Sequence, residues 1–359
     1  MWARRALGTI RAYPIRAIST SGGALFGSVL YGVKEEKQQS WRVEYPKLVL
    51  EHGGQLSRKI INEEDKTQLG LRLYQYQTCP YCCKVRAVLD YYGFSYEVVE
   101  VNPVTRSQLK FSKEYKKVPI LKTSAIERPI VESSLIISIL STFLHRPNRS
   151  FEDCVEFYPS HESTDPDTQK VSIKYPNQYF VMTEESKIDV GAARDEREWR
   201  EWIDSHFIHL ISPNVYRTWD ESLETFRYFD KVGEWDRNFP TWERYLAVYM
   251  GAAAMWGISK RLKKRHNIDD ERQAMKDACN KWLNALGGRK FMGGDQPNLA
   301  DLGLYGAINS FVGCSAFKDM REETKIGEWY DAVHQMVIQK QGRNLVAAKS
   351  AATEKQIVK

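Results

Sequence analysis

The sequence has few cysteines and only one C-x-x-C pair. Six cysteines occur in 359 residues, and Cys79 and Cys82 alone form that spacing. A four-ligand zinc site needs a second pair of ligands, and a disulfide framework needs a higher cysteine content. The remaining thiols are interpreted as ordinary core side chains: Cys83, Cys154, Cys279 and Cys314.

Acidic residues are missing from the N-terminus. Residues 1–34 contain five basic side chains and no acidic one, and Ser19, Thr20 and Ser21 lie among them. This composition is typical of a mitochondrial targeting segment. The apolar stretch from Gly22 to Val33 is shorter than the about 20 residues of a spanning helix. Residues 1–34 are predicted to be a targeting leader to the mitochondrion, with a weak membrane anchor as the alternative.

Charge of one sign is not in excess elsewhere. The net charge is +6, and five of the 52 basic residues lie in the leader, so 47 basic face 46 acidic side chains in the remainder. A nucleic-acid-binding protein usually concentrates basic residues. The sequence therefore gives no support to a nucleic-acid partner, and it contains no internal repeat or low-complexity tract.

The most informative segment present is the C-P-Y-C sequence from Cys79 to Cys82, which follows an alternating run at 71–76. This order predicts a strand, a loop and then a helix that begins at Pro80, where a missing N–H is tolerated. The unpaired N–H groups and positive dipole end of a helix stabilise a thiolate. Cys79 is predicted to be the exposed, activated sulfur, and Cys82 its buried partner.

Three later features place this motif in a thioredoxin-like domain. Gly93 ends the predicted helix, and residues 96–101 read as a second strand. Val118-Pro119 stands where thioredoxin-like folds have a cis-proline beside the thiol, with the preceding backbone exposed to a peptide or glutathione. Glu132 and Ser133 precede an apolar helix, whose N-terminus is suited to the γ-glutamyl carboxylate of glutathione.

The second half of the sequence is helical in pattern. Apolar stripes run from Trp199 to Leu210, ending before Pro213, from Tyr245 to Trp256, and from Met275 to Leu286. Val171–Lys174 and Tyr179–Met182 flank a Pro-Asn turn and predict a small hairpin. His206 and His209 share a helix face, but no carboxylates complete a metal site.

Phe291 to Asp301 carries the signal of a capped helix. Asn298 is predicted to cap the helix N-terminus, with Asp301 reaching back to its backbone. This arrangement resembles the folding motif of the C-terminal domain of glutathione transferases. The predicted fold is an α/β thioredoxin-like domain followed by an all-α glutathione-transferase-like C-terminal domain. The predicted segments are a leader (1–34), a connecting segment (35–69), the thioredoxin-like domain (70–146), a linker (147–190), the helical domain (191–345) and a tail (346–359).

Longer segments resemble the family of membrane-associated prostaglandin E synthases of type 2, over roughly residues 65–340. The matching runs are residues 73–82, 96–103, 117–121, 209–218, 249–255, 258–263 and 291–301. The resemblance implies isomerisation of prostaglandin H endoperoxide to prostaglandin E with glutathione as activator. It also implies a homodimer, peripheral membrane association, and haem bound through the glutathione sulfur. Family members occur in more than one compartment, so the Golgi membrane is the alternative location.

The resemblance also assigns roles to matching positions. Cys79 matches the essential cysteine, Tyr76 lies beside the thiol, and Cys82 matches the second, less critical cysteine. Val118 and Pro119 match the backbone clamp on glutathione, and Ser133 the contact at a helix start. Glu132 stands where the family has an aspartate. Tyr81 stands where a phenylalanine is often found.

Two other functions are compatible with the same residues. In a glutaredoxin-like disulfide oxidoreductase or transferase, Cys79 and Cys82 would exchange dithiol and disulfide. In a non-catalytic organelle protein, the same site would bind haem and glutathione. The C-P-Y-C motif does not separate these functions, whereas the long matches favour the synthase.

Overall fold

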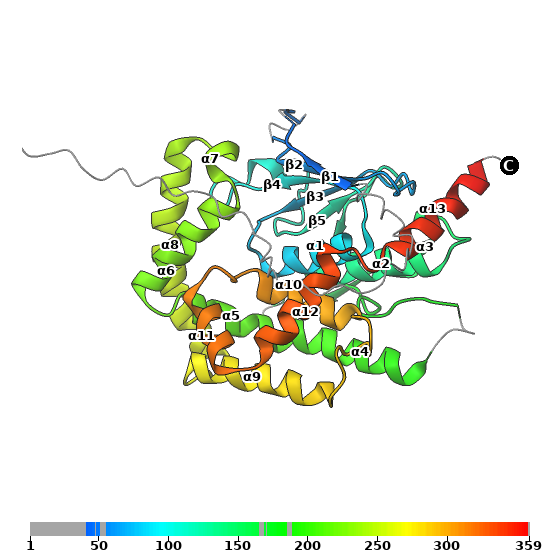
Figure 1. Cartoon of the computed structure of the whole chain (residues 1–359). Coiled ribbons are helices and arrows are strands. Elements are labelled where there is room, and N and C mark those ends of the chain that lie inside the picture. The colour runs from blue at the N-terminus through cyan, green and yellow to red at the C-terminus, as the bar shows by residue number, and fades with distance from the viewer. Residues whose placement is uncertain are drawn as a thin grey trace, which may run out of the picture. The chain divides into compact units, whose positions relative to one another are not determined.

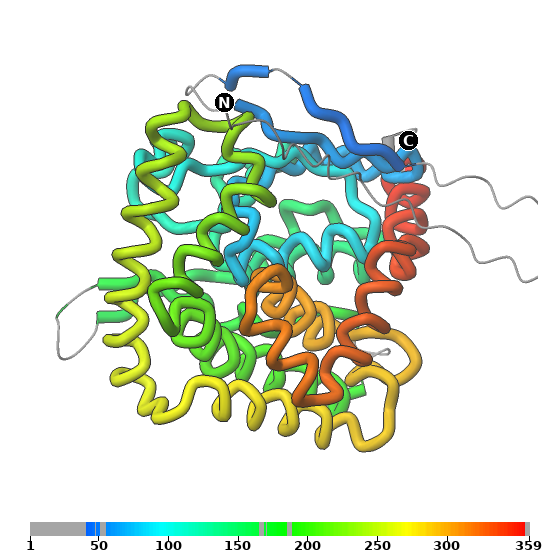
Figure 2. Tube along the Cα trace, turned by 60° about the vertical axis from the view of Figure 1, so that its left-hand side comes forward, coloured from blue at the N-terminus to red at the C-terminus, as the bar shows by residue number. Residues whose placement is uncertain are grey.

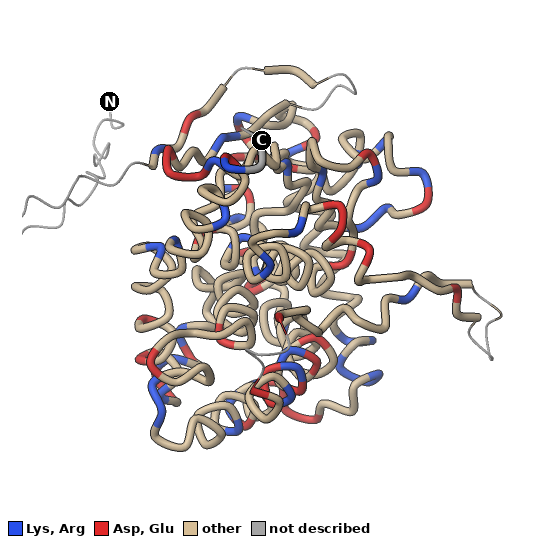
Figure 3. The backbone as a smooth tube through the Cα atoms, turned by 90° about the vertical axis from the view of Figure 1, so that its right-hand side faces the viewer, with Lys and Arg blue, Asp and Glu red and all other residues tan. Residues whose placement is uncertain are grey.

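The computed structural model describes residues 41–46, 48–50, 55–164, 169, 171–184 and 189–357, with side chains to residue 355. The leader predicted for residues 1–34 lies outside the described residues. Within the described chain, no helix is both long enough and apolar enough to cross a membrane. Basic and acidic residues are interspersed along the elements seen in Figure 3.

Among the described residues, six strands form a mixed sheet in the order β1-β2-β4-β3-β5-β6. β3 and β4 are parallel, and the other neighbouring strands are antiparallel. The predicted strands at 71–76 and 96–101 are confirmed as β3 and β4. The strands are β1 (Trp41–Glu44), β2 (Arg58–Asn62), β3 (Leu71–Gln75), β4 (Tyr96–Glu100), β5 (Ile120–Lys122) and β6 (Ile130–Val131).

Two of these strands come from the segment predicted to be a mere connection. β1 and β2 lie within residues 35–69, and β2 pairs with β4, placing Ile60 opposite Tyr96. The sheet therefore starts before residue 70. β1 is exposed along its whole length and β2 buries only two of its five residues. Such strands lack a clear apolar alternation and are held by pairing with their neighbours.

Two helices pack on this sheet and begin at the predicted site segments. α1 (Pro80–Tyr92) starts with its proline in the first turn and ends at Gly93, whose φ is 72°. α2 (Ser133–His145) follows Glu132 directly. A short 3₁₀ turn, η1 (Ser107–Leu109), lies between β4 and β5. Both predicted helix starts are confirmed.

The linker is more structured than its composition suggests, and its hairpin has a different partner strand. α3 (Phe151–Glu156) begins with a capping box made by Ser150 and Asp153. β8 (Val171–Lys174) pairs with β7 (His161–Thr164), whereas residues 176–179 form a turn and Tyr179–Met182 is not a strand. The prediction that Tyr179–Met182 supplies the second strand was wrong. The chain at Tyr179 instead bonds to the helical half through its hydroxyl and carbonyl groups.

The rest of the described chain is helical. α4 (Val190–Trp202) continues through a π-helical turn, η3 (Ile203–Phe207), into α5 (Ile208–Val215). The expected end before Pro213 was wrong, because Pro213 lies inside the last turn of α5. The remaining helices are α6 (Trp219–Val232), α7 (Trp235–Asn238), α8 (Thr241–Arg265), α9 (Glu271–Leu286), α10 (Leu299–Asn309), α11 (Ser315–Glu323), α12 (Ile326–Ile338) and α13 (Arg343–Ile357).

The apolar stripe of α8 is only partly a core stripe. Val248 and Ala252 are buried, but Tyr245 is 56% exposed and Tyr249 is 47% exposed. α8 packs on α6 through small residues, and a Cβ added to Gly251 would meet the Phe226 ring at 2.3 Å. The face of α8 that carries small side chains therefore packs on α6, and the face that carries the tyrosines is exposed to solvent. By contrast, the stripe in α9 is buried as predicted.

The segment predicted as a C-terminal tail is mostly the helix α13. Lys349 is 2% exposed, and its Nζ donates to the carbonyls of Arg146, Pro147 and Arg149 at 2.7, 3.1 and 2.6 Å. Three carbonyls just after α2 are thereby satisfied by one ammonium group. α13 thus belongs to the folded part of the chain. Burial lowers the pKa of Lys349 to about 8.

The two halves meet where α10 crosses α1, seen in Figures 1 and 2 beneath the sheet. Gly306 lies at the crossing, where an added Cβ would be 2.5 Å from Lys84 Cα. α10 begins with the predicted capping box: Asn298 accepts from the Asp301 N–H, and Asp301 accepts from the Asn298 N–H. The cap is buried and fixes where α10 starts against α1.

Candidate active site

Cys79 lies at the N-cap of α1, one residue before Pro80. The Cys82 thiol donates a hydrogen bond to its sulfur, and the N–H groups of Cys82 and Tyr81 also donate to it. These contacts lower the pKa of Cys79, although burial opposes them. Cys79 is half-buried, so the predicted exposure is only partial. The site therefore favours the thiolate form of Cys79 more than an ordinary cysteine environment does, and the N–H groups at the helix start contribute to this.

Cys82 is the buried member of the pair, as predicted. Its side chain is inaccessible to solvent. Burial, the hydrogen bond to Cys79 and the charge of Cys79 raise the pKa of Cys82. The two thiols therefore differ in state, with one favoured as thiolate and the other as donor.

Tyr76 lies beside this pair at the end of β3. Its backbone carbonyl accepts from the Cys79 N–H at 3.1 Å, and its ring packs in the same apolar cluster as both cysteines. Burial raises the pKa of Tyr76, and the guanidinium of Arg106, bonded to its hydroxyl, acts in the opposite direction. Tyr76 is thus a neutral donor near the thiol. Arg106 was not predicted from the sequence.

Val118 and Pro119 lie where the glutathione clamp was predicted. Both are buried, they precede β5, and the bond between them is cis. β5 pairs with β3, which leads into residues 76–79, the loop that ends at Cys79 and is called the thiol loop below. This connection brings residue 118 to the same end of the sheet as Cys79.

Glu132 and Ser133 form the start of α2. Glu132 has φ 66°, an uncommon conformation for a residue with a side chain, and its carboxylate does not cap the helix. The Tyr115 hydroxyl donates to that carboxylate and accepts from the Glu132 N–H, while burial raises the pKa of Tyr115. The helix start therefore keeps N–H groups that suit an anion, as a γ-glutamyl carboxylate requires. Tyr115 was also missed by the sequence, since no local pattern marks it.

Behind the thiol loop, buried polar side chains meet in a network. Gln75 and Glu100, at the ends of β3 and β4, are joined by a hydrogen bond of 3.1 Å, and Arg86 from α1 contacts Gln75. All three are less than 10% exposed. Other polar and charged residues occur in the same elements, so no local sequence pattern marks these three as buried partners.

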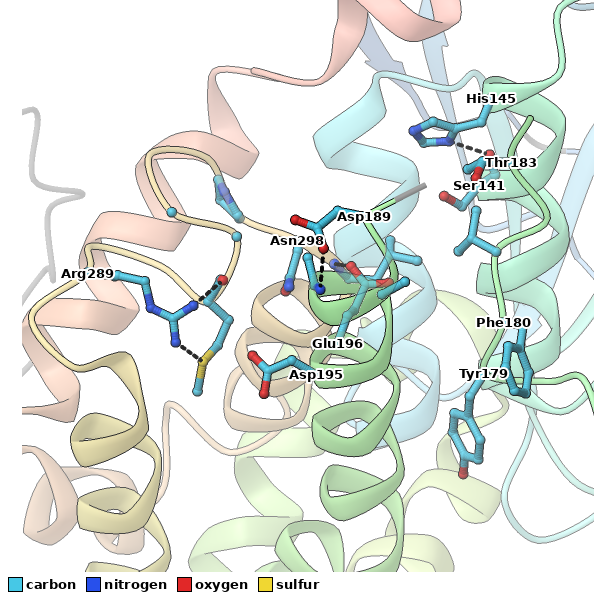
Figure 4. Close-up of a pocket in the computed structure, with 18 of the residues that line it drawn as sticks. Ser141, His145, Tyr179, Phe180, Thr183, Asp189, Asp195, Glu196, Arg289 and Asn298 are labelled. Atoms are coloured by element: carbon cyan, nitrogen blue, oxygen red, sulfur yellow. Dashed lines mark hydrogen bonds between the residues drawn. The ribbon is translucent and has the colours of Figure 1, made fainter. Parts of the chain in front are cut away.

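Two cavities lie near the start of the helical half. One of about 460 Å³ is lined by Glu132 together with Arg197, Lys174 and Glu201. Another of about 660 Å³ lies against α2, α4 and the start of α10, with Glu196, Arg289 and Asn298 in its wall (Figure 4). No predicted site residue lines the larger cavity. The smaller one adjoins the predicted glutathione end of the site.

The described residues around Cys79 do not form a set of ligands for a metal ion. Throughout the described residues, no group of three or more His, Cys, Asp or Glu side chains could hold a metal ion. His209 instead stacks on His266, with 4.3 Å between ring centroids.

Solved structures with a similar chain path are glutathione transferases and related enzymes. Glutathione S-transferase III in apo form matches with a TM-score of 0.44 and 15% identity, over 76% of this chain and 94% of that one. The β-etherase LigF from Sphingobium sp. strain SYK-6 matches with a TM-score of 0.45 and 17% identity, over 76% and 98%.

The sequence comparisons give one partial match to a family model and two relatives similar over most of the chain. The family model described as the glutathione S-transferase N-terminal domain matches residues 73–142. Prostaglandin E synthase 2 of Danio rerio is 44% identical over 292 residues, covering 79% of this chain and 75% of that protein. The mouse protein of the same name, from Mus musculus, is 43% identical over 271 residues, covering 73% and 69%. Identity of 43–44% to two relatives, over more than two thirds of this chain and of each of theirs, leads to one conclusion: the chain belongs to the prostaglandin E synthase 2 family.

Proposed function

We propose that this protein converts prostaglandin H endoperoxide to prostaglandin E in a glutathione-dependent isomerisation, with Cys79 as the essential nucleophile. The observation that carries the proposal is the half-buried Cys79 at the start of α1, with its pKa lowered by three donors. The family relationship supports the substrate, since relatives at 43–44% identity are named prostaglandin E synthase 2.

The residues around Cys79 fit glutathione. The backbone of Val118 would pair with the cysteinyl part of the peptide, and the start of α2 at Ser133 would receive its γ-glutamyl carboxylate. The Glu132 carboxylate, which does not cap α2 and accepts a hydrogen bond from the Tyr115 hydroxyl, would contact the γ-glutamyl ammonium group. Glutathione, when bound, supplies a second thiol beside Cys79.

The proposed reaction begins at the weak O–O bond of the substrate. The Cys79 thiolate attacks one endoperoxide oxygen, an S–O bond forms, the O–O bond breaks, and the other oxygen leaves as an alkoxide that is protonated to a hydroxyl. The carbon on the sulfur-bound oxygen then loses its hydrogen as a proton to water. A C=O bond forms from that electron pair, the S–O bond breaks, and the thiolate is regenerated. The product is an isomer of the substrate, so no external oxidant or reductant is consumed.

Tyr76 is proposed to assist the first step. Its hydroxyl is neutral, because burial raises its pKa, and it can donate to the thiolate or to the departing oxygen. Arg106, bonded to that hydroxyl, keeps its proton polarised. The fatty chain is proposed to lie against apolar side chains between the two halves.

A second candidate function is supported by the contact between the two thiols. Because Cys82 is hydrogen-bonded to Cys79, the pair could close to a disulfide in a glutaredoxin-like oxidoreductase. Binding of haem through the glutathione sulfur, in an organelle protein without isomerase activity, stays a prediction of the family resemblance. The homodimer, the membrane association and the mitochondrial location, with the Golgi membrane as alternative, also stay predictions.

The test is product analysis of the purified full chain with prostaglandin H endoperoxide, with and without glutathione and in haem-free and haem-loaded forms. Prostaglandin E formed faster than spontaneous breakdown, and only with glutathione, supports the proposal. Background rates in the haem-free form together with rapid reduction of a glutathione mixed disulfide would establish the oxidoreductase instead. Loss of isomerase activity on haem loading at cellular glutathione concentrations would support the haem-binding role.

A further inference from the structure

Gln77, two residues before Cys79, has both of its backbone groups held by buried charged side chains. Its N–H donates to Glu100 Oε1 at 2.6 Å, and its carbonyl accepts from Arg86 Nη2 at 2.6 Å. Glu100 ends β4 and Arg86 lies on α1. The peptide that leads into the thiol loop is thus gripped from two different elements.

The same two side chains meet further partners around that peptide. Arg86 Nη2 also donates to the Cys83 sulfur at 3.0 Å, and that thiol donates to the Gln77 carbonyl at 3.3 Å. Gln75 bridges the pair, since its Nε2 donates to Glu100 Oε2 at 3.1 Å and its Oε1 accepts from Arg86. Through these contacts, Arg86, Glu100 and Cys83 all bond to Gln75 or Gln77, the residues just before Cys79.

The network is buried and carries opposite charges. Glu100 is 2% exposed and Arg86 is 7% exposed. The hydrogen bond from Cys82 is the largest cause of the lowered pKa of Cys79, and the charge of Arg86 adds a smaller lowering. Burial raises the pKa of Cys82, and Arg86 opposes it. Burial also raises the pKa of Glu100 to about 7, against the opposing effects of Arg58 and Arg86. The charge of Glu100 therefore changes near neutral pH, whereas Arg86 stays cationic.

Other titratable groups surround this pair from every packed element. They are Arg58 on β2, Cys82 and Cys83 on α1, Tyr96 on β4, and Tyr228 and Tyr305 on the helical half. The tyrosines stay neutral because burial raises their pKa values. Arg58, which contacts Gln77 Oε1, is the other cation beside Glu100.

We propose that Arg86 and Glu100 are positioning residues for the reactive thiol: together they fix the peptide before Cys79, and their opposite charges set how readily Cys79 ionises. Arg86 favours the thiolate, and ionised Glu100 offsets part of that effect. The inference rests on the proposed function only in taking Cys79 as the working nucleophile.

The proposal makes opposite predictions for the two side chains. Glu100→Gln keeps the size and an acceptor oxygen but removes the negative charge, so the Cys79 thiolate is favoured more strongly. Arg86→Met removes the cation and one hold on Gln77, so the thiolate is favoured less. In the double variant both charges are gone, and the two electrostatic effects cancel in part. A merely structural role would not produce shifts of opposite sign.

The experiment is the pH dependence of iodoacetamide alkylation at Cys79 in the full chain, followed by mass spectrometry of the peptide containing it. Relative to wild type, the alkylation midpoint is expected about 0.3 pH unit lower in Glu100→Gln and about 0.5 unit higher in Arg86→Met. The double variant is expected between the two. Glu97→Gln is the control, because Glu97 lies on the same strand but pairs with Lys59 and Arg72.

An unchanged midpoint in Glu100→Gln, or shifts of the same sign in both single variants, overturns the proposal. If Arg86→Met does not fold, Glu100→Gln and the control decide it alone. Alkylation needs no prostaglandin, so its outcome is independent of the proposed isomerase activity. Opposite shifts without isomerase activity would leave this inference standing and reject the function.

Discussion

Lys84 of α1 and Asp204 of the π-helical turn η3 form a buried ion pair that joins the thiol helix to the helical half. Their side chains are 4% and 15% exposed. Ser134, at the start of α2, accepts from Lys84 at 3.0 Å and donates to Asp204 at 2.5 Å, and Tyr179 donates to Asp204 at 3.1 Å. Burial lowers the pKa of Lys84, and Asp204 opposes that effect. One carboxylate thus connects α1, α2 and the linker.

Removing one member of this pair should destabilise the protein. We expect Lys84→Met to lower the free energy of unfolding by about 3–5 kcal/mol, because Asp204 is left buried without its cation. Urea unfolding followed by fluorescence measures the change. The double variant Lys84→Met/Asp204→Asn should recover part of the loss. Arg194→Met, which breaks an exposed pair with Glu198, should change nothing measurable; equal stability of Lys84→Met and wild type contradicts the expectation.

The crossing of α10 and α1 should be sensitive to a single methyl group. A Cβ at Gly306 would lie 2.5 Å from Lys84 Cα and 2.6 Å from Lys84 N, so Gly306→Ala must push the helices apart. We expect a loss of about 1–3 kcal/mol in unfolding free energy. Gly257→Ala in α8 is the matched helical control, because nothing lies within 4 Å of its Cβ position. It should be neutral or stabilising by about 0.5–1 kcal/mol. Similar effects of the two substitutions would contradict this account of the crossing.

The lowered pKa of Cys79 should depend on the donor at residue 82. The hydrogen bond from Cys82 is the largest cause of that lowering. Cys82→Ala removes the donor, so the midpoint of Cys79 alkylation should rise by about one pH unit. Cys82→Ser keeps a hydroxyl donor and should stay close to the wild-type value. Equal midpoints in the two variants would mean that the thiol contact does not control the ionisation of Cys79.

The buried cap of α10 should give the protein a specific pH dependence. Asp301 accepts from the N–H groups of Met292, Gly293 and Asn298 and from Trp329 Nε1, at 3.0–3.3 Å. Burial nevertheless raises the pKa of Asp301 to about 6. Because the folded pKa exceeds the ordinary 3.8, the folded state binds the extra proton, and the contribution of Asp301 to stability grows as pH falls from about 6 to about 4.

The stability difference between wild type and Asp301→Asn measures this contribution. The unfolding free energy of wild type minus that of Asp301→Asn should become more positive by about 2 kcal/mol from pH 7 to pH 4.5, as followed by urea unfolding at each pH. Subtracting the two proteins removes the pH dependence that they share. If wild type instead loses stability relative to Asp301→Asn toward acid pH, the N–H donors outweigh burial and the folded pKa of Asp301 is lowered.

Local sequence patterns were sufficient for much of the fold. The starts of α1 at Pro80 and of α10 after Asn298 depend on caps and a proline within a few residues, so they could be read directly. β2 could not, since only its pairing with β4 gives it a buried face. The aromatic stripe of α8 misled for the opposite reason. The spacing correctly predicted a helix, but the face that packs on α6 carries small residues such as Gly251, and the aromatic face is exposed.

The candidate site was predictable where its residues stand in short segments with a known pattern: the C-P-Y-C loop, Val118-Pro119 and the start of α2 at Ser133. Cys79 and Cys82 share one loop, and their roles follow from the helix start. Arg106 reaches Tyr76, and Tyr115 reaches Glu132, across turns whose geometry no short pattern encodes. Partners far apart in sequence, such as Lys84 and Asp204, are joined only by the packing of the two halves.

The most direct test of the central claim compares prostaglandin E formation by wild type, Cys79→Ser and Cys279→Ser full chains at saturating glutathione. Cys279 is a buried thiol on α9 whose pKa is raised to about 12 by burial, so it serves as the matched control. We expect Cys79→Ser to lower kcat by at least about 10³-fold, because a serine hydroxyl is not ionised at this site. Cys279→Ser should retain activity within about tenfold. Isomerase activity retained by Cys79→Ser would contradict the assignment of Cys79 as the nucleophile.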